Sequence, residues 1–99
     1  MAATYEFDAA LWEWEGRAAW WFVSLPETTT DDIDERFGAK AAGFGSLKVE
    51  VTIGATTWRT SIFPDTKRGT FVLPVKKAVR TAEGLAGGSV VAVRLQVVA

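Results

Sequence analysis

The sequence predicts a mostly β protein, a small closed or split β-barrel of about six strands with two short helices, in a single domain over residues 1–99. A length of 99 residues suits one hydrophobic core. Segments in which apolar and polar residues alternate recur along the chain, and helix signals are confined to two short segments. Many short strands in so short a chain favour a barrel.

The N-terminal part predicts two strands. In "TYEFDAALWEWEG", Tyr5, Phe7 and Leu11 take the apolar positions of an alternating pattern, which is typical of a half-buried strand. The apolar positions then shift to Trp12 and Trp14. A β-bulge near residues 10–11 would explain the shift, because one inserted residue moves all later side chains to the other face. The next segment, "AAWWFVSL", is apolar on both faces and predicts a central or helix-covered strand.

A helix and a hairpin are predicted next. "ETTTDDIDERFG" has a threonine cap at Thr29 or Thr30, acidic residues in its first turn and a stop at Gly38. "LKVEVTIG" and "TTWRTSIF" alternate cleanly on either side of Gly54 and Ala55. They predict a β-hairpin over residues 46–63.

The C-terminal part predicts a strand, a second helix and a last strand. "TFVL" is the first of these, and Pro74 suits the first position of a helix over residues 74–83. Val75 and Val79 lie on the apolar stripe of this helix, and Gly84 ends it. "VVAVRLQVV" predicts the last strand. No internal repeat is visible in the residues.

The composition excludes several chemistries. Cysteine and histidine are absent, which removes disulfides, Ser-His and Cys-His nucleophile pairs and the common zinc sites. No catalytic residue, metal ligand or cofactor is therefore predicted, and the sequence favours a non-enzyme. The pattern of a signal peptide and a membrane-spanning run are both missing, which predicts a cytoplasmic protein without a membrane partner.

The net charge of −1 conceals an asymmetry between the two parts of the chain. Residues 1–57 carry four basic and ten acidic side chains, a net charge of −6. Residues 58–99 carry seven basic and two acidic side chains, a net charge of +5. Such a distribution indicates either a bipolar surface or two parts that attract each other in the fold.

The basic side chains suggest an anion site beside the second predicted helix. Lys76, Lys77 and Arg80 would lie on that helix, close to an N-terminus whose free N–H groups favour anions. The turn before the helix and one face of the hairpin can add further donors. The predicted ligand-binding residues are Lys76, Lys77, Arg80, Arg59, Ser61 and Lys67. The alternative is an ordinary solvated basic surface, or ion pairs with the acidic part of the chain.

Two other groups of residues have a structural interpretation. Asp31, Asp32 and Asp34 crowd the first predicted helix, where compensation of the helix dipole explains them without a bound cation. The five tryptophans could stack on bases or line a pocket, and packing in the core is the simpler interpretation. Exposure of two or more rings on one side would favour a binding role.

Three blocks of the sequence carry a family resemblance. They are "FDAALWEWEGRAAWWFVSLP", "GFGSLKVEVTIGATTWRTSIFP" and "LPVKKAVRTAEGLAGGSVVAVRL". Through them the chain resembles a bacterial family known as domain of unknown function 1905. The resemblance covers nearly the whole chain and implies a small β-barrel similar to double-split barrels, with no activity to transfer. The motif positions are occupied by Ser61, Phe63, Pro64, Leu73, Pro74, Lys77 and Arg80.

The last block is also similar to swapped-hairpin transcription regulators, with Gly88 and Ser89 in place of their Gly-Asp pair. The sequence therefore leaves more than one function open. The first is binding of a small anion (phosphate, nucleotide or carboxylate) beside residues 74–83. The alternative is a nucleic-acid-binding or protein-interaction module. The net charge of −1 disfavours nucleic acid, because binding to the phosphate backbone usually relies on a basic domain. The oligomeric state is not predicted.

Overall fold

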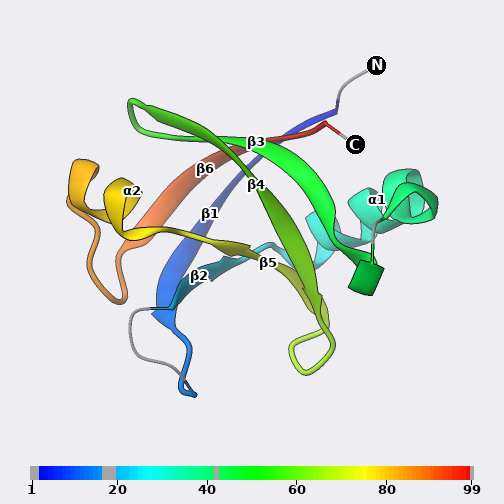
Figure 1. The fold of residues 1–99 in the computed structure, drawn as a ribbon, viewed down its shortest axis with the longest axis horizontal. Coiled ribbons are helices and arrows are strands. Elements are labelled where there is room, and N and C mark those ends of the chain that lie inside the picture. Colours follow the sequence, from blue (N-terminus) through cyan, green and yellow to red (C-terminus); the bar gives the residue numbers. More distant parts are fainter. Residues whose placement is uncertain (1–2, 17–19, 42, 99) are drawn as a thin grey trace.

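A computed structural model describes residues 3–16, 20–41 and 43–98 and confirms the predicted fold class. The chain forms a closed barrel of six antiparallel strands with two α-helices, one of them short (Figure 1). The strands are β1 (Thr4–Glu13), β2 (Trp21–Ser24), β3 (Leu47–Ile53), β4 (Thr56–Asp65), β5 (Thr70–Pro74) and β6 (Val90–Val97). The helices are α1 (Glu27–Phe37) and α2 (Lys77–Ala82), with 3-10 turns η1 (Gly38–Lys40) and η2 (Gly43–Gly45). Within these described residues, no helix has the length and apolar character needed to cross a bilayer.

Two long strands hold the barrel together, because each changes partner along its length. Residues 4–10 of β1 pair with β6, and residues 11–13 pair with β2. In the same way, residues 56–62 of β4 pair with β3, and residues 63–65 pair with β5. The order around the barrel is β1-β2-β5-β4-β3-β6. The barrel therefore consists of two four-stranded sheets that share β1 and β4.

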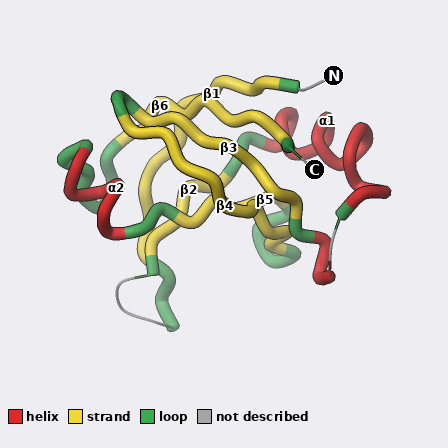
Figure 2. The backbone as a smooth tube through the Cα atoms, turned by 45° about the horizontal axis from the view of Figure 1, so that its top comes forward, coloured by secondary structure: helices red, strands yellow, loops and turns green. Residues whose placement is uncertain are grey.

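The topology has an internal twofold symmetry. The element order β-β-α-β occurs twice, as β1-β2-α1-β3 and as β4-β5-α2-β6. Exchanging β1 with β4, β2 with β5 and β3 with β6 leaves every strand pairing unchanged. Figure 2 shows α1 and α2 on opposite sides of the barrel, as this symmetry requires. The repeat lies in the order and pairing of the elements, which is why the residues themselves do not show it.

Two similar hydrogen bonds fasten the helical segments to the long strands. The Tyr5 hydroxyl donates to Asp32 Oδ2 over 2.6 Å, and the Thr56 hydroxyl donates to Glu83 Oε2 over 2.6 Å. Each bond joins the start of a long strand to a carboxylate 27 residues further along the chain. Burial of the phenol, together with its bond to Asp32, raises the pKa of Tyr5 to about 12. Each β-β-α-β unit thus has one such bond between its long strand and its helical segment.

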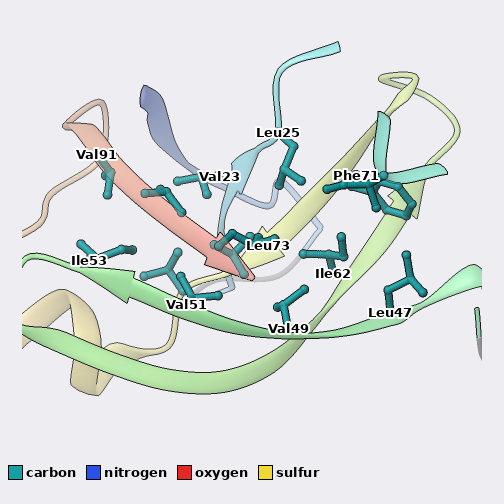
Figure 3. Packing of buried hydrophobic residues seen from close by; sticks show 14 of the residues in the cluster. Val23, Leu25, Leu47, Val49, Val51, Ile53, Ile62, Phe71, Leu73 and Val91 are labelled. Atoms are coloured by element: carbon teal, nitrogen blue, oxygen red, sulfur yellow. The ribbon is translucent and has the colours of Figure 1, made fainter. Parts of the chain in front are cut away.

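The core fills the space between the two sheets. Alternate residues of each strand point inward, and the inward-pointing residues of β3 and β6 are all buried (Figure 3). Ile33 of α1 and Val79 of α2 close the two ends of this core. The largest fully buried side chains are Leu11, Leu25, Ile33, Leu47, Ile62, Leu73 and Leu95. No described polar or charged residue is fully buried.

The bulge expected near residues 10–11 is absent. The pairing of β1 with β6 runs without interruption to Ala10, and the pairing with β2 begins at Leu11. Leu11 therefore stays in the core, whereas Trp12 and Trp14 point to the outer face. The alternation never shifts. These tryptophans lie outside because the uninterrupted register turns even-numbered positions outward, where Trp12 and Trp14 contact each other.

Both helices differ in detail from their predicted bounds. Helix α1 begins at Glu27 after Pro26, without a side-chain cap. Thr30 instead accepts a hydrogen bond from the Phe71 amide over 3.1 Å. The helix expected over residues 74–83 is wrong at its start, because Pro74 is the last residue of β5 and pairs with Phe22. Helix α2 is only six residues long.

Candidate functional site

The candidate site is a cleft at the place where β4 and β5 separate. The two strands pair only through residues 63–65 of β4. Beyond that point β4 follows β3, while β5 follows β2 and leads towards α2. Figure 1 shows the two ribbons diverging from the loop that joins them. A cavity of about 1040 Å³ lies between β4 on one side and residues 72–77 on the other.

Aromatic rings form much of the cleft. Trp14, Trp20 and Phe63 line it and are exposed by 40%, 51% and 42%. Among the described residues only Val90 joins them as an exposed large apolar side chain. Trp21 and Trp58 also line the cleft and pack partly against the core. Aromatic surface of this extent, gathered in one concavity, is typical of a binding site rather than of a core.

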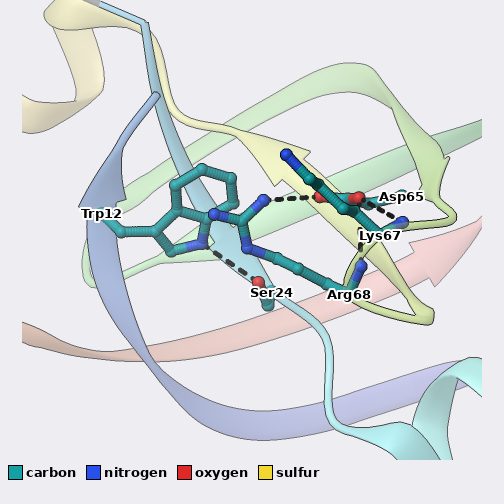
Figure 4. A network of polar contacts seen from close by, with 5 residues as sticks. All are labelled: Trp12, Ser24, Asp65, Lys67 and Arg68. Atoms are coloured by element: carbon teal, nitrogen blue, oxygen red, sulfur yellow. Dashed lines mark hydrogen bonds and ion pairs between the residues drawn. The ribbon is translucent and has the colours of Figure 1, made fainter. Parts of the chain in front are cut away.

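A stack of rings on the outer face supports this surface. The Trp12 ring centroid lies 6.2 Å from that of Trp14 and 5.2 Å from that of Phe22. The Arg68 guanidinium lies over the Trp12 ring, 3.8 Å from its centroid. The Trp12 indole N–H donates to Ser24 Oγ over 3.0 Å (Figure 4). These contacts hold Trp12 in place beside Trp14.

Asp65 organises the turn beside the stack. It accepts hydrogen bonds from the amides of Lys67 and Arg68 over 3.0 and 3.2 Å, and from Arg68 Nη1 over 2.8 Å (Figure 4). Burial alone would raise the pKa of Asp65, but the hydrogen bonds and charge of Arg68, with the Lys67 amide, outweigh it and lower that pKa. The turn so formed places Thr66 and Lys67 at the cleft.

Four basic residues line the same cleft, and all four are among the predicted ligand-binding residues. They are Arg59 from β4, Lys67 from the turn, and Lys76 and Lys77 from the start of α2. Arg59 Nε lies 3.2 Å from Glu50 Oε2. In the described part of the chain, no carboxylate forms an ion pair with any of the three lysines. The cleft therefore combines an aromatic surface with the positive charge of three lysines, none of which forms an ion pair with a described carboxylate.

Two of the predicted residues lie elsewhere. The Arg80 guanidinium folds back, donates to the Val75 carbonyl over 3.0 Å and lies 5.6 Å from the Trp21 ring centroid. It supports the wall of the cleft from behind and does not line it. Ser61 lines a neighbouring cavity of about 580 Å³, together with Lys48 and Arg59.

Among the acidic residues of α1, Asp32 has partners within the fold. Asp32 accepts the Tyr5 hydrogen bond and lies 3.3 Å from Arg36 Nε. No group of three or more acidic side chains in the described residues has the arrangement of a metal site.

The tryptophans were the part of the site that the sequence pattern obscured. Packing in the core was the simpler interpretation, and it fails for Trp14 and Trp20, which are exposed. The alternation of apolar and polar residues in the first strand did carry a signal for the outward position of these rings. If the apolar phase through Leu11 is kept without a bulge, Trp12 and Trp14 fall on the outer face.

A family model described as domain of unknown function, DUF1905, matches residues 7–95. No curated protein matches the chain.

Proposed function

Because the chain belongs to the DUF1905 family, which carries no assigned activity, we propose a function from the cleft itself: it binds a small ligand that joins a flat or apolar body to a negatively charged group. The aromatic rings contact the body. Lys76, Lys77, Lys67 and Arg59 attract the charge. The contribution of α2 is the charge of its lysines, since a helix of six residues has too few aligned peptides to add a large dipole.

One observation carries this proposal, namely that three exposed rings and three lysines without a described ion-pair partner surround one cavity. Ligand pockets typically measure about 300–1000 Å³, with largely apolar walls and a few polar groups. The cavity of about 1040 Å³ is of this kind. Exposed rings weaken the case for a purely structural role, because the exposed part of each ring contributes no burial energy.

Fluorescence titration tests the proposal, since Trp14 and Trp20 line the cleft. The probes are inorganic phosphate, adenosine monophosphate, phenyl phosphate and anilinonaphthalene sulfonate. We expect the probes that combine rings with charge to bind more tightly than phosphate alone. A Lys76→Ala/Lys77→Ala variant should bind them at least about tenfold more weakly, since about 1.4 kcal/mol corresponds to a factor of ten.

The matched control is Lys40→Ala/Arg94→Ala, which removes the same charge from exposed positions outside the cleft. This variant should bind as the wild type does. Equal weakening in both variants would mean that only net charge matters, and no binding of any probe at millimolar concentration would contradict the proposal.

The same combination of rings and cations is also found in proteins that bind single-stranded nucleic acid. That function is the second candidate, and exposed tryptophans beside lysines favour it. If this second function is correct, a fluorescent oligothymidine should bind to the protein, and its affinity should fall steeply as the salt concentration rises. A weak, salt-independent response would leave the small ligand as the better interpretation.

A further inference from the structure

One strand edge inside the cleft has no strand partner. Residues of an antiparallel strand point their N–H and C=O groups alternately to one neighbour and to the other. The Val98 amide donates to the Lys48 carbonyl, so the even-numbered residues of β3 face β6 and the odd-numbered ones face β4. Ile53, Val51, Val49 and Leu47 lie opposite the even-numbered residues of β4. The backbone groups of Thr57, Arg59 and Ser61 therefore point away from β3.

Strand β5 does not satisfy these groups. It begins to pair with β4 only at Phe63, and within the described chain residues 57–61 pair with β3 alone. The side of the strand that is left open faces the diverging β5, and Trp58, Arg59 and Thr60 of this segment line the cleft. An open strand edge is a template for another strand, because its N–H and C=O groups recur at the spacing of an extended backbone.

The positive charge around this edge indicates a negatively charged partner. Lys76 and Lys77 lie across the cleft, Lys67 lies in the adjoining turn, and no described carboxylate pairs with them. Residues 57–61 span about 16 Å at roughly 3.3 Å per residue, the length of a five-residue strand. A cavity of about 1040 Å³ is larger than a single phosphate or carboxylate needs.

We propose that the cleft takes a short extended acidic peptide, which adds as a strand to residues 57–61 of β4. The peptide would be the anionic ligand of the proposed function, on which this inference rests. Its backbone pairs with Thr57, Arg59 and Ser61, its carboxylates meet the lysines, and its aromatic or apolar side chains contact Phe63 and the exposed tryptophans. Main-chain bonds supply affinity in this mode of recognition, and side-chain contacts supply selectivity.

The test uses the peptide acetyl-Glu-Phe-Glu-Phe-Glu-amide with the full chain. We expect it to change the tryptophan fluorescence and to slow hydrogen exchange at the amides of Arg59 and Ser61 by at least about tenfold at saturation. The amides of Glu6 and Asp8 occupy the equivalent edge of β1 and should not change. Lys-Phe-Lys-Phe-Lys should bind at least about tenfold more weakly.

Two modifications, one in the peptide and one in the protein, distinguish strand addition from binding through side chains alone. The acidic peptide with N-methyl groups on alternate amides keeps every side chain but lacks the donors that face β4, so it should lose most of its affinity. In the protein, Ser61→Pro removes one N–H from the open edge of β4 and none that points to β3, whereas Ser61→Ala keeps it. The proline variant should bind the peptide more weakly than the alanine variant.

The outcomes are distinct. If small aromatic anions bind in a lysine-dependent way and the peptide does not bind, the proposal that the ligand is a peptide is wrong. The proposed function would then still stand. Peptide binding that tolerates N-methylation, or that leaves the Arg59 and Ser61 amides unprotected, would overturn strand addition alone. Failure of every probe would overturn both.

Discussion

At the scale of single residues, Asp65 determines how the turn beside the cleft is built. Its carboxylate accepts two amide hydrogen bonds from the turn and one from the Arg68 side chain, which in turn covers Trp12. An asparagine at this position keeps one oxygen for the amides but loses the charge that holds Arg68. The fixed position of Arg68 therefore depends on the ionised form of Asp65.

We expect Asp65→Asn to lower the free energy of unfolding by about 1–2 kcal/mol near neutral pH. The folded state lowers the pKa of Asp65, so the stabilisation is present above the ordinary carboxyl pKa of about 4 and is lost as the pH falls through the lowered value. The gap between wild type and variant, measured by urea unfolding, should therefore narrow towards about pH 2. A gap that does not change with pH would mean that charge plays no part.

The sequence predicted the charges of the site better than its rings. Lys76 and Lys77 were identifiable because like charges at neighbouring positions are conspicuous. The tryptophans were not, because large rings are found in cores far more often than on surfaces, and only the strand register shows which face they occupy. Arg80 was predicted to join the lysines, yet its guanidinium donates a hydrogen bond to the Val75 carbonyl instead.

At the scale of elements, local patterns decided which predictions hold. The hairpin over residues 46–63 is confirmed in β3 and β4, because alternation and a turn at Gly54 specify it locally. Gly54 has φ +58°, and a Cβ there would overlap the Glu83 carboxylate. The start of α2 was missed because pairing with Phe22 holds Pro74 in β5, a long-range effect that no local pattern reveals.

The two hydroxyl–carboxylate bonds give a matched pair of variants for the attachment of the helical segments. We expect Tyr5→Phe and Thr56→Val each to lower the free energy of unfolding by about 1 kcal/mol near neutral pH. They should differ in alkali. The folded state raises the pKa of Tyr5 to about 12, so its contribution is complete below the ordinary pKa of about 10 and disappears as the pH rises towards the raised value.

Wild type and Thr56→Val should therefore lose stability between about pH 10 and pH 12 more steeply than Tyr5→Phe does. Tyr5 is the single tyrosine of the chain, so ultraviolet absorbance of the tyrosinate reports its pKa directly. An ordinary pKa in the folded protein, or equal alkaline slopes in all three proteins, would contradict the bond to Asp32.

At the scale of the whole molecule, the two β-β-α-β units depend on each other. Strand β3 pairs only with β4 and β6, which belong to the other unit, and β6 pairs with β1 and β3. Neither unit can therefore complete a barrel alone. The order in which the two units are joined matters less, because exchanging them leaves every pairing unchanged.

A circular permutant tests this reasoning. The described ends of the chain are adjacent, since the Val97 amide donates to the Ala3 carbonyl over 3.3 Å. The permutant begins at Ala55, ends at Gly54 and joins the old ends through a flexible linker of about six residues. We expect it to fold and to show the far-ultraviolet spectrum and the ligand response of the wild type. The control permutant opens between Ile62 and Phe63, inside the strand that both sheets share. It should not fold cooperatively, because cutting β4 separates the part that pairs with β3 from the part that pairs with β5. If the permutant opened at the turn is as unstable as the control, chain order is essential and the two units are not interchangeable.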